Sequence, residues 1–364
     1  MALTQVRHLS AADALRLIRE CGSATAVVEN RTRLRELVPS ASDKLIQAVS
    51  QMDDALERAK REAEYAEKHH IRCLTIDEDD YPAALRQCDD APLVLYVLGS
   101  CDLNARRSVS VVGTRHITPY GERLCHDIVG GLAEAWPDLV VVSGLAYGVD
   151  VHAHRAALES KIPTVGVVAH GLDTLYPASH RSVAVRIVHE GGAIVTEYMS
   201  GTSIDRSFFL HRNRIVAGMT PATLVVESAA HGGSLTTARL ALEYGREVFA
   251  CPGRATDEYS AGCNRLIRHH GATLVTSAGD ILETLGWQPV AKPAAAVQQE
   301  LFPTLSPEEQ RILDALRQAE TMLANEIVTA TGMDYAKVSA LLFQMEMEGK
   351  VRVHGGVRYS AANA

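Results

Sequence analysis

The sequence predicts an α/β protein whose Rossmann-like core, built on a parallel sheet, is flanked by a helical N-terminal domain and a winged-helix-like C-terminal domain. Three observations favour this fold class. Eight short apolar runs alternate with helix-length segments between residues 93 and 275. Apolar residues recur at helical intervals over residues 1–70, and a helix–turn–helix pattern followed by a hairpin pattern fills residues 305–359. The 364 residues suffice for two or three domains of roughly 100 to 200 residues each.

Residues 1–70 have the pattern of a small helical domain. Ser10 precedes Asp13 at the spacing of a helix N-cap, and apolar residues from Leu15 to Val49 recur at helical spacing. The composition of this segment indicates no particular chemistry. We therefore favour a packing or protein-contact module over a DNA-binding one.

The core is predicted to span residues 71–287. Its apolar runs are nearly continuous, which indicates strands buried on both faces and is typical of a parallel sheet covered by helices. The residues after it, 288–304, are rich in Ala, Pro and Gln and have no periodicity, so we expect a linker there. The eight runs are residues 93–98, 109–112, 139–142, 164–168, 193–195, 224–226, 248–250 and 273–275.

Residues 305–364 are expected to form the winged-helix-like domain. Ser306 starts a helix, residues 327–347 read as two helices joined at a glycine turn, and residues 351–359 read as a hairpin. The domain holds six Lys or Arg and eight Asp or Glu, and Lys337 is the only basic residue of the second helix of the pair. A helix that reads duplex DNA needs a positive face. We therefore expect this domain to contact protein rather than DNA.

Composition and charge narrow the class of protein. The formal net charge of -8 excludes a generally basic surface, so a nucleic-acid site would be a local positive patch. The seven cysteines include no Cys-x-x-Cys pair, which disfavours a disulfide framework and a zinc site, and no cofactor is expected. The first residues lack the apolar segment of a signal peptide, and no run approaches the roughly 20 apolar residues of a membrane span. We expect a cytoplasmic protein that has no membrane partner.

Three turns follow predicted strands and precede predicted helices. At the carboxyl ends of parallel strands such turns bring free helix N–H groups to a ligand, so the ligand should be an anion. No Gly-x-Gly-x-x-Gly or Gly-Lys-Ser/Thr motif occurs in the core, which disfavours ordinary dinucleotide or ATP binding. For the first turn, a purely structural role is an equal alternative. The residues are Gly113 and Arg115 of the first turn, Ser143, Gly144, Tyr147 and Gly148 of the second, and Gly232, Gly233 and Ser234 of the third.

The segment at residues 206–214 interleaves arginines, aromatic rings and an amide. Single-stranded nucleic acid is bound by this combination, because bases stack on rings, at roughly 1 to 3 kcal/mol per base, and phosphates pair with cations. The candidates are Phe209, Arg212, Asn213 and Arg214. Arg212 and Arg214 diverge by about 200° on a helix, so we expect one to contact the ligand and the other to brace the fold. His152 and His154 diverge in the same way, so they do not share a metal ion.

Several motifs, in order along the chain, resemble those of the DNA-processing protein A family, DprA/Smf. They are YPAAL at 81–85, APLVLYVLG at 91–99, VVGTR at 111–115, SGLAYGVD at 143–150, RNRIVAG at 212–218, GGSLTTA at 232–238, CPG at 251–253 and GCNRLI at 262–267. The resemblance covers nearly the whole chain. It implies a sterile-alpha-motif-like helical domain, an extended Rossmann core and a winged-helix-like domain.

The resemblance also implies a function. Members of this family bind single-stranded DNA, dimerise through the Rossmann core and load the RecA recombinase during natural transformation. This chain is therefore expected to protect incoming single strands and to hand them to RecA. The implied DNA pocket is lined by the glycine turns and the 206–214 segment, with Arg206 as the basic residue before the phenylalanine. The second turn of the family usually carries Arg where this chain has Tyr147. We expect the dimer surface at Leu266 and Ile267.

An enzyme is the alternative. The core also resembles nucleoside-monophosphate phosphoribohydrolases, whose signature Pro-Gly-Gly-x-Gly-Thr-x-x-Glu corresponds here to residues 231–239. The glycine pair is kept, but Arg239 stands where those enzymes have their glutamate, and a cation does not stabilise an oxocarbenium-like transition state. Glu197 and Glu227 are weak substitutes for the missing base. We therefore expect a nucleotide-binding cradle without catalysis.

Overall fold

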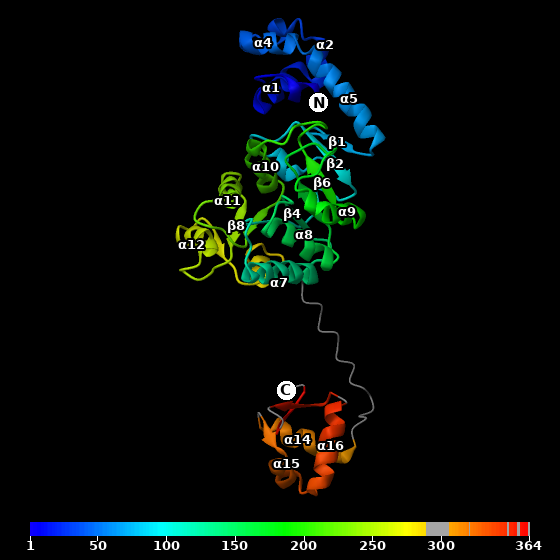
Figure 1. Cartoon of the computed structure of the whole chain (residues 1–364), viewed down its shortest axis with the longest axis vertical. Coiled ribbons are helices and arrows are strands. Elements are labelled where there is room, and N and C mark those ends of the chain that lie inside the picture. Colours follow the sequence, from blue (N-terminus) through cyan, green and yellow to red (C-terminus); the bar gives the residue numbers. More distant parts are fainter. Residues whose placement is uncertain (289–305, 320, 348, 355–356, 363–364) are drawn as a thin grey trace. The chain divides into compact units, whose positions relative to one another are not determined.

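The computed structural model describes residues 1–288, 306–319, 321–347, 349–354 and 357–362 (Figure 1). The chain divides into two compact units, Met1–Pro289 and Val290–Ala364. The linker expected at residues 288–304 lies outside the described residues except for its first position. In the described parts of the chain, no helix combines the length and the apolar character that a membrane span requires.

Helices form the N-terminal part of the first unit, as the sequence predicts (Figure 1). Ser10 caps α1 by accepting a hydrogen bond from the amide of Asp13 at 3.0 Å. Leu17, Val27 and Val49 are buried, which accounts for the helical spacing of the apolar residues. The elements are η1 (Ala2–Gln5), α1 (Ala11–Cys21), α2 (Ala24–Glu29), α3 (Leu34–Leu37), α4 (Asp43–Ser50) and α5 (Asp53–Lys68).

A nine-stranded sheet organises the rest of the first unit. All eight apolar runs predicted as strands belong to it. The strand order is β1-β2-β6-β5-β4-β3-β7-β8-β9. The strands are β1 (Arg72–Thr75), β2 (Val94–Gly99), β3 (Ser108–Val112), β4 (Val140–Ser143), β5 (Thr164–Val167), β6 (Ala193–Thr196), β7 (Ala222–Val225), β8 (Glu247–Ala250) and β9 (Thr273–Leu274).

The direction of one strand, β2, differs from the expectation of a parallel sheet. The strands from β6 to β9 in the spatial order are parallel, whereas β2 is antiparallel to both β6 and β1. A strand buried on both faces is apolar along its length whichever way it runs, so the run of β2 does not reveal its direction. The strand β1 was not predicted at all, because its four residues, RCLT, are too few and too polar at the ends to stand out.

Helices cover both faces of the sheet. Side chains such as Val111 and Phe249 point to the face covered by α7, α8 and α13. Side chains such as Val112 and Val142 point to the opposite face, where α10, α11 and α12 pack. The helices of the core are α6 (Ala83–Arg86), α7 (Pro119–Ala135), α8 (Val149–Glu159), η2 (Ala178–His180), α9 (Arg181–His189), α10 (Arg206–Gly218), α11 (Gly233–Glu243), η3 (Glu258–Ser260), α12 (Ala261–Arg268) and α13 (Ala278–Thr284).

The second unit has the winged-helix order of elements that the sequence predicts. Ser306 and Glu309 form a capping box at the start of α14, and Gly332 ends α15 in the left-handed conformation, at φ 67°. The expected hairpin is present, although its tip at residues 355–356 lies outside the described residues. A short strand, β10, joins the hairpin and was not predicted. The elements are α14 (Pro307–Arg317), β10 (Met322–Leu323), α15 (Ala324–Thr331), α16 (Tyr335–Met347), β11 (Val351–His354) and β12 (Arg358–Ala361).

Candidate functional site

The strand order places a crevice at the centre of the sheet. From β3 the chain proceeds to β4 on one side, and it later returns to β7 on the other side. The carboxyl ends of β3, β4 and β7 therefore surround the point where the strand order reverses, which is where doubly wound folds bind ligands. Each of these three strands ends in one of the predicted glycine turns, so the turns meet in space although they are far apart in the sequence.

A pocket of about 290 Å³ lies at this point. It is formed by the turns after β3, β4 and β7 together with one side of α10. Ten of the fourteen residues predicted for the site line it. They are Gly113, Arg115, Gly144, Tyr147, Phe209, Arg212, Asn213, Gly232, Gly233 and Ser234.

Four of the predicted residues do not line this pocket, for structural reasons. Ser143 is fully buried, and its hydroxyl donates to the Val111 carbonyl oxygen at 2.6 Å. Gly148 has φ 75°, and a Cβ there would lie 2.1 Å from the carbonyl oxygen of Thr114, so the turn itself requires glycine. Arg206 is the exposed first residue of α10. Arg214 points elsewhere.

Arg212 and Arg214 of α10 diverge as their spacing predicts. Arg212 faces the pocket, and its Nη1 donates to the carbonyl oxygens of Gly144, at 2.6 Å, and Val167. Arg214 forms a largely buried ion pair with Glu197 at 2.5 Å and donates to the Asp90 carbonyl oxygen at 2.7 Å. Arg214 therefore braces the fold, while Arg212 joins α10 to the second turn and presents part of its charge to the pocket.

An exposed cation and aromatic rings stand at the rim of the pocket. The Arg115 guanidinium lies over the Phe209 ring, 5.8 Å from its centroid, and forms no ion pair with any described residue. The Phe209 ring meets Tyr176 edge-on at 5.6 Å. Tyr147 is 46% exposed and packs edge-on against His180 at 4.9 Å. The rim thus offers a free positive charge next to two accessible ring surfaces.

The glycines of the second and third turns serve different purposes. A Cβ at Gly144 would lie 2.4 Å from Arg212 Nη2 and 2.5 Å from Asp150 Oδ2, so internal packing excludes any larger residue. A Cβ at Gly232 or Gly233 would meet no atom closer than 3.5 Å. Gly233 begins α11, and no side chain caps this helix. Open space beside uncapped helix N–H groups is the geometry that accommodates a phosphate.

Asp150 lines the pocket, but it was not predicted from the sequence as a site residue. It is buried in the first turn of α8 and lines the pocket beside Arg212. Burial raises the pKa of its carboxyl group, while Arg212 and the amide of Ala146 act in the opposite direction. The sequence signal that could have identified it is an acidic residue two positions after Gly148. Arg115 and Arg212 still outnumber this carboxylate among the charged residues that line the pocket.

The two glutamates and the arginine considered for a catalytic role each bind other protein groups. Glu227 accepts hydrogen bonds from the amide and hydroxyl of Thr118, at 2.8 and 2.6 Å, and so anchors the start of α7. Glu197 pairs with Arg214. Arg239 is 65% exposed at its side chain and pairs with Glu243 on α11 at 2.7 Å.

The two histidines of α8 have separate environments. His154 is fully buried, its Nδ1 lies 2.8 Å from the Thr164 hydroxyl, and burial lowers its pKa to about 3. The Nε2 of His152 lies 3.6 Å from Glu122. Among the described residues, no cluster of three or more His, Cys, Asp or Glu side chains could hold a metal ion.

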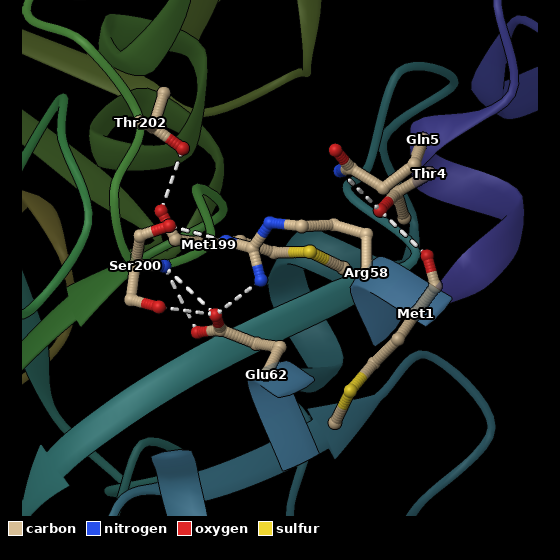
Figure 2. Close-up of polar contacts among 8 residues, drawn as sticks. All are labelled: Met1, Thr4, Gln5, Arg58, Glu62, Met199, Ser200 and Thr202. Carbon is tan, nitrogen blue, oxygen red and sulfur yellow. Dashed lines mark hydrogen bonds and ion pairs between the residues drawn. The ribbon is translucent and has the colours of Figure 1, made fainter. Parts of the chain in front are cut away.

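The N-terminal helices are attached to the segment that leads into α10 (Figure 2). Glu62 of α5 is buried, and its carboxylate accepts from the Ser200 hydroxyl at 2.6 Å and from the Ser200 amide at 3.0 Å. Arg58, one turn earlier, pairs with Glu62 at 3.0 Å and donates to the Ser200 carbonyl oxygen. These contacts hold the loop between β6 and α10, and therefore the start of the helix that carries Phe209 and Arg212.

The residues expected at a dimer surface lie on α12. Leu266 and Ile267 are partly buried against the core of the first unit. Their role in association remains a prediction.

Fold and pocket together define a class: a doubly wound α/β protein that has an arginine-lined pocket at the switch point of its sheet and an additional winged-helix unit. The chain belongs to the DNA recombination-mediator protein A family, because the model of this family matches residues 72–286. The model of the DprA winged helix domain matches residues 292–357. The resemblance drawn from the motifs is thereby confirmed.

Individual relatives agree with this assignment. The putative DNA processing protein DprA of Mycobacterium tuberculosis is 39% identical over 321 residues, which cover 83% of this chain and 80% of that protein. Protein Smf of Synechocystis is 34% identical over 319 residues, with 79% of each chain covered. The X-ray structure of DNA processing protein A from Streptococcus pneumoniae is similar with a TM-score of 0.58 and 31% identity over 75% of this chain and 96% of that one. The structure of the Helicobacter pylori protein is similar with a TM-score of 0.53 and 28% identity, and the match covers 60% of this chain and 97% of that one.

Proposed function

We propose that this protein binds single-stranded DNA in the pocket at the switch point and, without catalysing a reaction, protects incoming strands and loads them with RecA during natural transformation. The observation that carries the proposal is the meeting of an unpaired Arg115, the Phe209 ring and the uncapped start of α11 in one pocket. Cation and amides fit phosphates, and rings fit unstacked bases.

Single strands suit this pocket better than duplex. A base reaches a ring face for stacking when it is not held in a paired helix, and both Phe209 and Tyr147 lie on or near the rim. The protein is acidic overall, with a formal net charge of -8, so a long duplex gains little from the rest of the surface. The Helicobacter pylori relative is described as having a single-stranded DNA binding mode, which supports the same ligand here.

The absence of catalysis is part of the proposal. Glu227 and Glu197, the acids that could replace the glutamate of a phosphoribohydrolase, are both bound to protein groups. The residue at the position of that glutamate, Arg239, pairs with Glu243 rather than lining the pocket.

A titration that compares ligands tests the proposal. Fluorescence anisotropy should show tight binding of oligothymidylate, much weaker binding of duplex of the same length, and no release of free base from nucleoside monophosphates. Release of free base would favour the enzyme. Equal binding of duplex and single strand would contradict the proposed role of the rings.

Association and the RecA partner need separate tests. We propose a cytoplasmic homodimer that uses Leu266 and Ile267 of α12. Sedimentation equilibrium of the Ile267→Glu variant should give the monomer mass, and a persistent dimer would reject this surface. Loading is expected to appear as faster RecA filament assembly on protein-coated strands than on bare strands, and an unchanged or slower rate would contradict it.

A further inference from the structure

A groove of about 510 Å³ lies next to the pocket and runs along α8. Three residues, Arg115, His116 and Tyr147, line both the pocket and the groove. The two hollows are therefore continuous at the rim, and Arg115 stands at the passage between them. Neither the family resemblance nor the glycine turns pointed to the groove.

The lining of the groove is suited to a polyanion. It includes Arg155 and His152 of α8 besides the shared Arg115, and no described residue that lines it carries a carboxylate. Arg155 is exposed and forms no ion pair with a described residue. Two acids lie near the groove without lining it: Glu122 is 3.6 Å from His152, and Glu159 is 3.6 Å from His126. Burial lowers the pKa of His152, so the positive charge of the groove comes from Arg115 and Arg155.

Fold geometry explains why Arg155 is available. Arg155 lies on the solvent side of α8, between the buried residues His154 and Ala156. Arg212 and Arg214 of α10, by contrast, use their guanidinium groups to hold backbone carbonyl oxygens and the partly buried Glu197. A cation that is not needed by the fold can pair with a phosphate at little structural cost.

We propose that this groove binds the phosphodiesters that follow the pocket on the same single strand, with Arg155 as a phosphate contact and Tyr147 as the ring that the strand passes. The inference rests on the proposed binding of single-stranded DNA in the pocket. It also gives the path of the strand, which leaves the pocket past Arg115 and continues along α8.

The test measures the affinity of the wild type and of Arg155→Ala for oligothymidylates from about 3 to about 12 nucleotides long, because sites of this kind span several nucleotides. Short oligomers that fill the pocket alone should bind both proteins equally. Longer oligomers should bind the variant roughly 3- to 10-fold more weakly, with a salt slope of log K lower by about 0.7 for the lost phosphate contact. Arg155→Lys should restore most of that slope.

A matched control is Arg186→Ala, which removes an exposed arginine of α9 that pairs with Glu190 at 2.8 Å and lines neither hollow. It should change neither affinity nor slope at any length. If wild type binds all lengths and Arg155→Ala matches it throughout, the groove is rejected while the pocket stands. If wild type binds no length, the proposed function fails and the groove fails with it. A loss that is equal for short and long oligomers would also reject the groove.

Discussion

Arg115 of the core and Lys337 of the winged-helix unit differ in the surroundings of their positive charge. In the core, Arg115 is exposed, unpaired among the described residues and next to uncapped helix amides. In the winged-helix unit, Lys337 is the only basic residue of α16, and it pairs with Glu308 at 2.5 Å. The exposed apolar residues of α16, Phe343 at 66% and Met347 at 76%, offer no phosphate contact. An acidic protein can thus bind a polyanion through placement of a few charges rather than through their number.

The largest effect should come from Arg214, a core arginine that does not line the pocket. Arg214→Ala leaves Glu197, whose side chain is only 14% exposed, without its arginine, and breaking a pair buried to this degree costs about 3 kcal/mol. We expect the free energy of unfolding in urea to fall by this amount. Arg239→Ala, which removes an exposed arginine, should change it by less than about 0.5 kcal/mol. A stable Arg214→Ala variant that has lost DNA binding would show that this side chain belongs to the site.

The next largest effect should come from the exposed core arginine. Arg115→Ala removes a charge-assisted contact worth about 1.5 to 3 kcal/mol, so single-strand affinity should fall about 10- to 100-fold. The melting temperature should change little, because the exposed Arg115 side chain forms no ion pair with a described residue and contacts only the face of Phe209 through its charge. Anisotropy titrations with several sequences of equal length measure this. A loss confined to one sequence would mean that Arg115 reads a base instead of a phosphate.

A smaller effect should follow from restoring the arginine that this family usually has in the second turn. Tyr147 is half-exposed at the rim, so an arginine there has room to meet a phosphate. Tyr147→Arg should steepen the salt slope of log K by about 0.7 at low salt. Tyr147→Phe, which keeps the ring, should leave the slope as it is. A slope that does not change in Tyr147→Arg would place this position outside the path of the strand.

The smallest effect should come from the winged-helix unit. Lys337→Ala removes the one basic residue of α16, which is already paired, so single-strand affinity should change less than about 2-fold, in keeping with the small energies of exposed ion pairs. The same titration measures it. A loss as large as that of Arg115→Ala would overturn the contrast between Arg115 and Lys337.

The sequence predicted the main features of the fold because the relevant signals are local. The apolar runs of β3, β4 and β7 and the glycines after them identified the three turns, and the reversal of strand order then brought the turns together. The helical spacing of Arg212 and Arg214 predicted that they diverge.

Other features depend on contacts that no local pattern encodes. The antiparallel direction of β2 is set by its neighbours β1 and β6. Which arginine of α10 faces the pocket depends on the position of Glu197, and the groove along α8 depends on the packing of the second turn against Arg115. The roles of Asp150 and of Glu62, which holds Ser200 from a distant helix, likewise follow from tertiary structure.

The most direct test of the account is a crystal structure of the protein with a short oligothymidylate. We predict a phosphate within hydrogen-bond distance of the Gly233 or Ser234 amide and of the Arg115 guanidinium, with a base against Phe209 or Tyr147. A strand that lies on another surface, with the start of α11 unoccupied, would contradict it.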